Sequence, residues 1–298
     1  MAFEPPRRLV RALGETAPNG DDWLEKLPDA VEQAVALREL TVERVQVPGG
    51  RSSVVLLVRR ADGTPAVLKL APRRARPESE AAALAHWGGL GAVRMLEADG
   101  AAGVLLLERL HPEVSVRSLP EAKALLEAAG TLRRLWVEPP SGYAFETVAE
   151  RTGRQAAAMT RSAGDAEVAP LVTAAVAVRE ELLAAPPEGR LLHGTFRQSK
   201  VLAGERMPWL AVGPDPVVGE CAFDLARLVR DRVEDLIASP SGASITRRRI
   251  RRLAESLEVD QERLRGWTLF RAVESGVRAL RVGRPKDAEL LLEFAGWV

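Results

Sequence analysis

A lysine and a glutamate, Lys69 and Glu80, are the first side chains in this sequence whose types and setting could do chemistry. Lys69 lies in a β-forming run and Glu80 near the start of an alanine-rich stretch, and both follow a turn that contains Gly49, Gly50 and Ser52. Because glycine has no Cβ, backbone N–H groups in such a turn can approach phosphate oxygens. Lys69 would then reach the phosphates while Glu80 holds its ammonium group in place. The arrangement predicts a phosphate-handling site, although a surface lysine and a helix-start glutamate are also common without one.

The segments around these residues predict a small β-rich region. Strand patterning occurs over residues 40–47, 54–60, 65–70, 93–97 and 104–107. Asp62-Gly63 is a typical hairpin turn between the second and third of these strands. A helix is predicted from Pro77, because carboxylates occupy its first turn, where the helix dipole stabilises negative charge. Residues up to about 38 are predicted to be helical, most clearly after Pro28.

The second half of the chain is predicted to be mostly helical. The long amphipathic stretches are residues 121–136, 146–162, 168–185, 222–238, 244–257 and 262–281. A short β-like interruption covers residues 190–192, 201–203 and 209–212. We therefore expect an α+β protein with an N-terminal lobe over 1–110 and a mostly helical C-terminal lobe over 111–298.

The charge balance excludes a molecule that attracts polyanions through its overall field. The 298 residues contain 42 basic and 41 acidic side chains, for a formal net charge of +1. This balance gives no whole-molecule attraction for nucleic acid or for an anionic membrane surface. The arginine-rich segment 246–252 resembles a nucleic-acid patch in isolation, but acidic residues follow closely and predict a solvated helix face. Only five of the basic residues are lysine, which indicates a GC-rich coding genome such as an actinobacterial one.

Cysteine and histidine content limits the possible metal and redox chemistry. Cys221 is the single cysteine, so the chain can form no intramolecular disulfide and no cysteine-based zinc cluster. The three histidines are far apart in the sequence, which argues against a polyhistidine metal site. The N-terminus has no apolar signal-peptide stretch, and no window approaches the roughly 20 apolar residues of a membrane span. A cytoplasmic location is therefore expected.

Several stretches resemble the kinases that inactivate streptomycin and the related hydroxyurea phosphotransferases. They are residues 61–70, 80–84, 105–109, 192–194 and 217–225. The resemblance runs from Trp23 to Trp267 and implies the protein-kinase-like, two-lobed fold of aminoglycoside phosphotransferases. It also implies ATP or another nucleotide as cofactor. In that family the segment at Glu108 and Leu110 is the hinge that meets adenine.

The catalytic motifs depart from the family pattern. The family loop reads His-Gly-Asp-Leu-His-x-x-Asn, whereas this loop begins at His193 and has Thr195 in the position of the catalytic Asp. Arg197 replaces the second His, and Lys200 replaces the Asn that helps to bind Mg²⁺. Further along, Gly213 stands where the family has its main Mg²⁺-binding Asp.

These replacements matter because phosphoryl transfer needs a metal held by oxygen ligands, preferably carboxylates. Gly213 has no side chain, Lys200 repels a cation, and Thr195 is not a base near pH 7. Asp215 is the nearest substitute carboxylate, but two residues of extended chain displace it by roughly 6–7 Å. We therefore expect that Mg²⁺ is not bound and that the ATP- and Mg²⁺-dependent mechanism is lost.

The residues that remain in the loop permit more than one role. Arg197 and Lys200 could hold an anion where the metal normally lies, or Lys200 could be an ordinary solvated lysine. His193 and Asp224 are expected to brace the loop more readily than to take part in chemistry.

The predicted function is that of a catalytically degenerate antibiotic-kinase homologue, a pseudokinase that keeps its cleft. It would bind a nucleotide, a small anionic or polyhydroxylated molecule, or a protein partner. One alternative is an enzyme of natural-product biosynthesis that uses His193, Thr195, Arg197 and Lys200 for other chemistry. Another is an active kinase of the streptomycin or hydroxyurea type.

Overall fold

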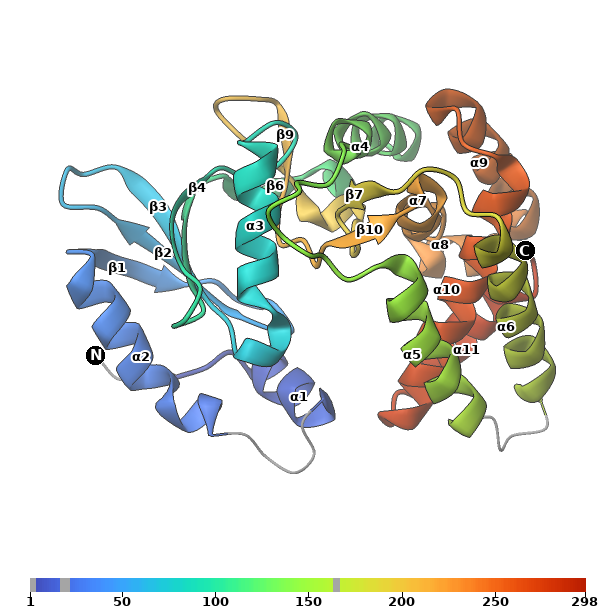
Figure 1. Ribbon diagram of the computed structural model, residues 1–298, viewed down its shortest axis with the longest axis horizontal. Coiled ribbons are helices and arrows are strands. Elements are labelled where there is room, and N and C mark those ends of the chain that lie inside the picture. Colours follow the sequence, from blue (N-terminus) through green and yellow to red (C-terminus); the bar gives the residue numbers. More distant parts are fainter. Residues whose placement is uncertain (1–3, 17–21, 163–166) are drawn as a thin grey trace. The chain divides into compact units, whose positions relative to one another are not determined.

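The computed structural model describes residues 4–16, 22–162 and 167–298 (Figure 1). The chain divides into two compact units: unit 1 is Met1–Glu113 with Ala203–Asp215, and unit 2 is Val114–Leu202 with Pro216–Val298. The lobes predicted over 1–110 and 111–298 stay a prediction. Residues 203–215 belong to unit 1, whereas the division into 1–110 and 111–298 assigns them to the second lobe. Part of the predicted N-terminal helical region, residues 1–3 and 17–21, lies outside the described residues.

Unit 1 is built on a five-stranded antiparallel sheet in the order β1-β2-β3-β5-β4. Its strands are β1 (Thr41–Val45), β2 (Val54–Arg59), β3 (Pro65–Leu70), β4 (Met95–Asp99) and β5 (Val104–Glu108). All five strands were predicted, and β4 begins two residues later than the pattern indicated. The hairpin at Asp62-Gly63 is also present, with the Asp62 carboxylate accepting a hydrogen bond from the Thr64 amide at 2.9 Å.

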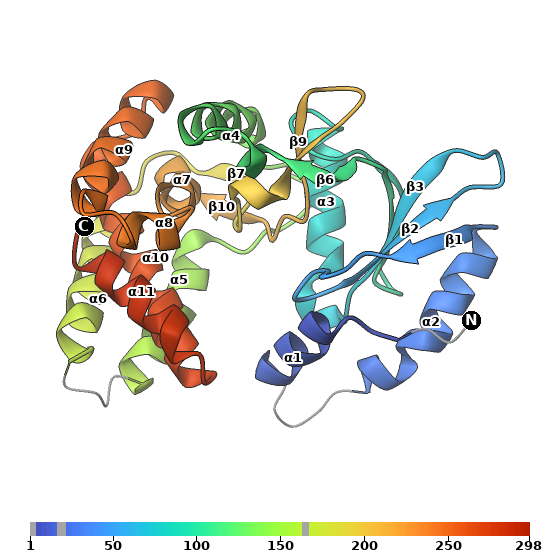
Figure 2. The ribbon, with the colours of Figure 1, turned by 180° about the vertical axis from the view of Figure 1, so that it is seen from behind.

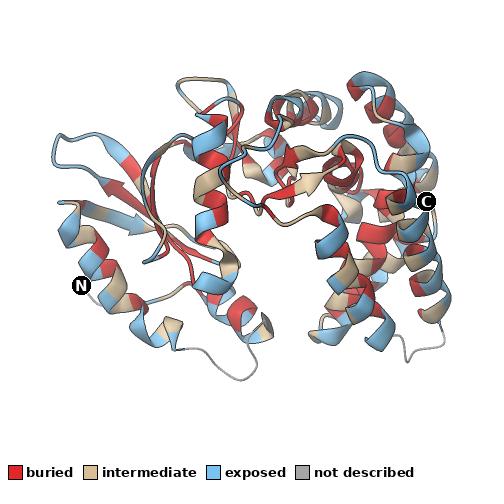
Figure 3. Ribbon diagram, viewed as in Figure 1, coloured by how far each residue is buried: buried red, intermediate tan, exposed pale blue. Residues whose placement is uncertain are grey.

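The alternation of side chains in β3 decides where its lysine lies. Helices α1 (Arg7–Thr16) and α2 (Trp23–Leu37) share one apolar core with Leu68 and Leu70 of β3. Since successive residues of a strand point to opposite faces, Lys69 projects from the other face. Helix α3 (Pro77–Trp87) lies on that side of the sheet, opposite α2 (Figures 1 and 3).

Unit 2 is organised around the long helix α10 (Gln261–Arg281). The other helices of the unit are α4 (Glu121–Leu135), α5 (Val148–Ser162), α6 (Ala169–Ala184), α7 (Cys221–Val229), α8 (Val233–Ile237), α9 (Gly242–Leu257) and α11 (Pro285–Ala295). Helix α10 packs against α5, α6, α7, α9 and α11, and its contact with α11 is visible in Figure 2. Trp267 of α10 is fully buried and makes edge-on ring contacts with Phe223 and Phe270.

Short strands accompany these helices. Strands β7 (Arg190–Leu192) and β10 (Val217–Gly219) form an antiparallel pair in unit 2. Strands β6 (His111–Ser115), β8 (Val201–Ala203) and β9 (Trp209–Ala211) form a three-stranded sheet, and the boundaries between the units fall within β6 and β8.

Some elements differ from the sequence-based predictions. The stretch 222–238 is not one helix, because Arg232 adopts a left-handed conformation with φ of 59° and separates α7 from α8. Strands β6 and β10 and helix α11 were not predicted individually. In the arginine-rich helix α9, four arginines are exposed as predicted, but Arg249 is buried and donates to the carbonyls of Val229 and Asp231, both at 2.7 Å. None of the helices in the described part of the chain is long and apolar enough to cross a membrane.

Gly103 directly precedes β5, and its backbone conformation can be tested by substitution. Its φ is +70°, and an added Cβ would lie 2.3 Å from the carbonyl oxygen of Ala71. Gly63 has φ of +83°, yet an added Cβ there would meet no atom within 4 Å. Gly63→Ala should therefore lower the free energy of unfolding by about 1 kcal/mol, from backbone strain alone. Gly103→Ala should cost about 1–3 kcal/mol more, because steric overlap is added to strain.

Urea unfolding followed by circular dichroism measures both free energies. Equal losses in the two variants would contradict the close approach of Gly103 to Ala71.

Candidate functional site

The structure brings Lys69 and Glu80 together in unit 1. The Lys69 ammonium forms an ion pair with the Glu80 carboxylate, and the two side chains are only 12% and 6% exposed. Lys69 is held in register between Val55 of β2 and Leu105 of β5, so the sheet fixes its position. An ammonium group has three N–H donors, so pairing with Glu80 leaves Lys69 able to contact a phosphate oxygen.

The backbone of the predicted turn explains why glycine occupies positions 49 and 50. Gly49 has φ of +70°, and an added Cβ would lie 3.0 Å from the carbonyl oxygen of Gln46. An added Cβ on Gly50 would lie 3.1 Å from the carbonyl oxygen of Ser53. Close packing within the turn therefore explains both glycines, and phosphate contact by Gly49, Gly50 and Ser52 stays a prediction.

Glu108 and Leu110 lie at and just after the end of β5. The Glu108 carboxylate accepts hydrogen bonds from the Arg94 amide at 2.7 Å and from Arg206 Nη2 at 2.7 Å. Leu110 is buried and packs close to Gly204. A Cβ added to Gly204 would lie 3.0 Å from Leu110 Cδ2. Residues of the returning segment 203–215 thus pack against this part of β5, and the hinge role of Glu108 and Leu110 stays a prediction.

In unit 2, the loop that begins at His193 is held by a buried carboxylate. Asp224 on α7 is fully buried and accepts hydrogen bonds from the backbone amides of His193 at 2.8 Å and Gly194 at 3.0 Å. From α10, Arg271 donates to the carbonyl oxygens of Gly194 and Phe223, both at 2.7 Å. Asp224 and Arg271 therefore secure the start of the loop from two helices.

His193 contributes to the interior of the loop. Its ring is completely buried and lies edge-on against Phe196, with 5.4 Å between the ring centres. Its Nδ1 atom accepts a hydrogen bond from the Thr195 amide at 3.4 Å. These contacts fit the predicted bracing role.

The two altered loop positions contact each other. Lys200 Nζ donates a hydrogen bond to Thr195 Oγ1 at 2.6 Å. The turn between them is fixed by Asp231, which accepts a hydrogen bond from the Gln198 amide at 2.6 Å. In the positions where the resemblance places a base and a metal ligand, the loop therefore has a hydroxyl bound to an ammonium group.

The substitute carboxylate, Asp215, is engaged within unit 1. Arg76 Nη2 lies 2.5 Å from Asp215 Oδ1, and Gly213 has a left-handed φ of 60°. Mg²⁺ prefers oxygen ligands and above all carboxylates. The side chains at 200 and 213 supply no such oxygen, and the nearby carboxylate is paired with a guanidinium, so these residues do not fit the metal. Among the described residues, no group of three or more His, Cys, Asp or Glu is placed to hold a metal ion.

Burial changes the acidity of two groups on α7. Burial raises the pKa of Asp224 above its ordinary value, while Arg271 and the two backbone amides act in the opposite direction. Burial, with a further contribution from Asp224, raises the pKa of the Cys221 thiol to about 12. Cys221 is therefore an unreactive thiol at neutral pH.

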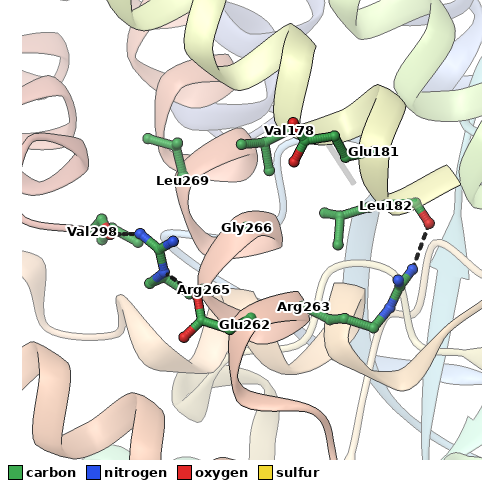
Figure 4. Close-up of a pocket in the computed structure, with 9 residues that line it drawn as sticks. All are labelled: Val178, Glu181, Leu182, Glu262, Arg263, Arg265, Gly266, Leu269 and Val298. Carbon is green, nitrogen blue, oxygen red and sulfur yellow. Dashed lines mark hydrogen bonds and ion pairs between the residues drawn. The ribbon is translucent and has the colours of Figure 1, made fainter. Parts of the chain in front are cut away.

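A pocket elsewhere in unit 2 is not formed by the predicted site residues. It lies between α6 and α10 (Figure 4). The lining residues are Val178, Glu181, Leu182, Glu262, Arg263, Arg265, Gly266, Leu269 and Val298. At its edge, Arg263 donates to the Leu182 carbonyl oxygen at 2.5 Å and also pairs with Glu220.

Comparison with solved structures identifies the fold. The chain matches aminoglycoside phosphotransferase APH(4)-Ia, in a ternary complex with ADP and hygromycin B, with a TM-score of 0.64 and 15% identity. The match covers 89% of this chain and 96% of that one. Choline kinase LicA from Streptococcus pneumoniae matches with a TM-score of 0.62 and 12% identity, over 91% of this chain and 99% of that one. The protein thus has the kinase-like α+β fold that the sequence predicted.

Sequence comparison identifies the family. The model of the aminoglycoside/hydroxyurea antibiotic resistance kinases matches residues 38–283. Streptomycin 6-kinase from Streptomyces glaucescens is 35% identical, over 90% of this chain and 87% of that protein. Hydroxyurea phosphotransferase from Kitasatospora aureofaciens is 36% identical, over 98% and 87% respectively. The chain belongs to the aminoglycoside/hydroxyurea antibiotic resistance kinase family, as its motifs indicated.

The structure adds residues that sequence reasoning missed. Arg76, Arg271 and Asp231 each contact a predicted segment, but none belongs to a recognisable motif. The resemblance around 217–225 did indicate Asp224, whose carboxylate the structure places beneath the loop.

Removing the Asp224 carboxylate should release the loop. Asp224→Ala leaves the buried amides of His193 and Gly194 without their acceptor and removes the negative charge that interacts with Arg271, so the free energy of unfolding should fall by about 3–5 kcal/mol. Asp235→Ala, an exposed carboxylate in α8, is the matched control and should cost less than about 1 kcal/mol. Chemical unfolding measures both values, and similar losses would contradict the bracing role.

Cys221 should label slowly in the folded protein. A rise in thiol pKa from 9.0 to about 12 lowers the thiolate fraction, so labelling at pH 8 should be about 10³-fold slower than in the urea-unfolded chain. The folded state favours the protonated thiol, so this stabilisation is complete below pH 9 and is lost as pH rises toward 12. Stopped-flow labelling with a disulfide reagent measures the rate; equal rates in both states would show that the thiol is not protected.

Proposed function

We propose that this protein binds a nucleotide, or another small anionic or polyhydroxylated ligand, and does not transfer a phosphoryl group by a metal-dependent mechanism. The observation that carries the proposal is the 2.6 Å hydrogen bond from Lys200 Nζ to Thr195 Oγ1. By the resemblance in sequence, Lys200 corresponds to a metal ligand of the family motif and Thr195 to its catalytic carboxylate, so this bond would join a cation and a neutral hydroxyl at those positions.

The Thr195 hydroxyl is a poor substitute for a catalytic carboxylate. A general base must accept the proton of the substrate hydroxyl as the reaction proceeds, and its pKa should lie near the working pH. A neutral alcohol oxygen that already accepts a hydrogen bond from an ammonium group has little basicity left. Activation of a substrate hydroxyl through Thr195 is therefore not supported.

The metal-binding positions support the same proposal. In phosphoryl transfer a metal ion neutralises charge on the transferred group. Lys200 is itself a cation, Gly213 has no side chain, and Asp215 is paired with Arg76. The positive charge near a bound anion would then come from side chains of this protein.

Nucleotide binding is supported by the part of the site that keeps the family arrangement. Lys69 is held in place by Glu80 and would contact the phosphates of a nucleotide. Structures with the same fold were determined with ADP and with AMP. Glu108 and Leu110 are the residues we assign to the adenine side.

An active small-molecule phosphotransferase is the second candidate. The observation that favours it is the 34–36% identity to two streptomycin 6-kinases and a hydroxyurea phosphotransferase. Those proteins are kinases by name, and the match extends over most of this chain. In this case the substrate would be a hydroxyl-bearing small molecule, and the loop would work without its usual carboxylate.

Thermal unfolding with ATP separates the two candidates. ATP should raise the Tm equally with and without Mg²⁺, because binding needs no metal, and Lys69→Met should abolish the shift. Lys286→Met is the matched control, since Lys286 is an exposed lysine on α11, and it should keep the shift. A parallel assay with ATP, Mg²⁺ and either streptomycin or hydroxyurea should show no phosphorylated product by mass spectrometry.

Two results would overturn the proposal. Product formation would establish the active kinase, and absence of any Tm shift with ATP in either condition would exclude nucleotide binding. The triple variant Thr195→Asp, Lys200→Asn, Gly213→Asp tests the cause, since it should make the ATP response depend on Mg²⁺.

A further inference from the structure

Helix α1 lies before the residues that the family model matches. That match begins at residue 38, whereas α1 spans Arg7–Thr16. Leu9 and Leu13 of α1 are buried in the same apolar core as Val54 of β2, so the helix is anchored on the sheet of unit 1. The helix is therefore a fixed support beside the sheet, outside the segment that the family model covers.

Two contacts join α1 to the glycine turn between β1 and β2 (Figure 2). Pro6, which directly precedes α1, is buried, and a Cβ added to Gly49 would lie 3.4 Å from Pro6 Cγ. Glu15, near the other end of α1, forms an ion pair with Arg51. The two ends of the helix therefore contact the turn at positions only two residues apart.

The carboxylate of this ion pair is largely shielded from solvent. The Glu15 side chain is only 11% exposed, and that of Arg51 is 37% exposed. Arg11 Nε lies 3.7 Å from the other carboxylate oxygen of Glu15, but the Arg11 side chain is mostly exposed. Because water screens a shielded carboxylate less, Glu15 attracts the Arg51 guanidinium more strongly than a carboxylate in an ordinary surface ion pair would.

The turn itself has little internal support. The Gln46 amide donates to the Val55 carbonyl oxygen at 2.8 Å and closes the base of the turn. Within residues 47–53, all of which the structure describes, no backbone–backbone hydrogen bond joins one residue of the turn to another. The contacts with α1 therefore restrain the turn beyond its base.

We propose that Glu15 is a positioning residue, which acts through Arg51 to hold the glycine turn in the conformation that binds nucleotide phosphates. Backbone N–H groups of a turn can converge on phosphate oxygens only in certain conformations. Restraint of the turn before binding raises affinity, because less conformational freedom is lost when the ligand binds. The inference deepens the proposed function and rests on it for the claim that this turn contacts the phosphates.

An arginine in a phosphate-binding turn could also contact the anion directly. The ion pair argues against this role for Arg51, because the Glu15 carboxylate already neutralises the guanidinium and draws it toward α1. The two roles make opposite predictions for a variant in which the charges are exchanged, Glu15→Arg with Arg51→Glu.

Titration calorimetry with ATP, in the full chain and without Mg²⁺, tests the positioning role. Glu15→Gln should weaken ATP binding about three- to tenfold, as expected if the turn keeps its binding conformation only a third to a tenth of the time. Adenosine has no phosphate, so its affinity should not change, whereas general damage to the fold would lower both affinities. Glu25→Gln removes an exposed carboxylate of α2 and is the matched control, which should bind ATP as wild type does.

Exchange of the two charges separates positioning from direct contact. Glu15→Arg with Arg51→Glu restores the ion pair with opposite polarity, so the double variant should bind ATP within about twofold of wild type. Arg51→Glu alone puts two carboxylates together and should bind ATP more weakly than Glu15→Gln does. If Arg51 contacted the phosphates directly, the double variant would bind as weakly as Arg51→Glu. Arg51→Met breaks the ion pair from the side of the turn and should reproduce the selective loss of ATP affinity even if Glu15→Gln does not fold.

Tryptic cleavage after Arg51 reports on the turn without any ligand. Trypsin must capture the arginine side chain, so a turn that is held by Glu15 should be cut slowly. In ligand-free protein, Glu15→Gln should raise the rate of cleavage between Arg51 and Ser52 at least about fivefold, because this rate follows the population of the released turn. Mass spectrometry of the fragments measures the rate, and Glu25→Gln should leave it unchanged.

The two proposals fail in different ways. Equal cleavage of wild type and Glu15→Gln, or ATP binding that is equal in both, would overturn the positioning role while nucleotide binding stands. Absence of ATP binding by wild type would overturn the proposed function and this inference with it, whatever the rate of cleavage.

Discussion

The hydrogen bonds from the loop amides to Asp224 determine much of the geometry in unit 2. A fully buried carboxylate is stable only where donors surround it, and here the donors are the backbone of His193 and Gly194. The same carboxylate lies close to Arg271, whose guanidinium reaches the loop from α10. One buried anion thus links the β7 strand end, α7 and α10, and the loop keeps this geometry independently of which side chains follow Gly194.

This constraint would allow the proposed change of chemistry in the loop to leave its backbone conformation unaltered. The groups that hold it are backbone amides and carbonyls, which are present whatever the side chains are. Side chains such as those of Thr195, Arg197 and Lys200 can therefore differ in charge and basicity while the backbone contacts of the loop remain. The near-zero net charge of the whole chain does not reveal such a local change, because 42 basic and 41 acidic side chains balance only over all 298 residues.

Regular patterns made much of the fold predictable. Alternation of apolar residues located the five strands of unit 1, and the position of Lys69 within one strand with Glu80 at the start of the next helix correctly indicated their ion pair. The break at Arg232 was not predictable, since a left-handed arginine leaves no mark in the hydrophobic period. Nor were the bonds from Arg271 to the carbonyls of Gly194 and Phe223, because they depend on the packing of α10 on α7.

The segment 203–215 has a consequence for synthesis of the chain. Its Arg206 contacts Glu108 and the carbonyl of Gly89, and the backbone of Ala211 bonds with Gly91 and Val93, so unit 1 is completed by residues about 100 positions downstream. On the ribosome, the emerging N-terminal sheet would therefore lack these partners until about half of unit 2 has been translated. A fragment that ends at residue 113 would leave the backbone of Gly91 and Val93 without these hydrogen-bond partners. Folding of unit 1 therefore depends on residues that follow the first segment of unit 2 in the sequence.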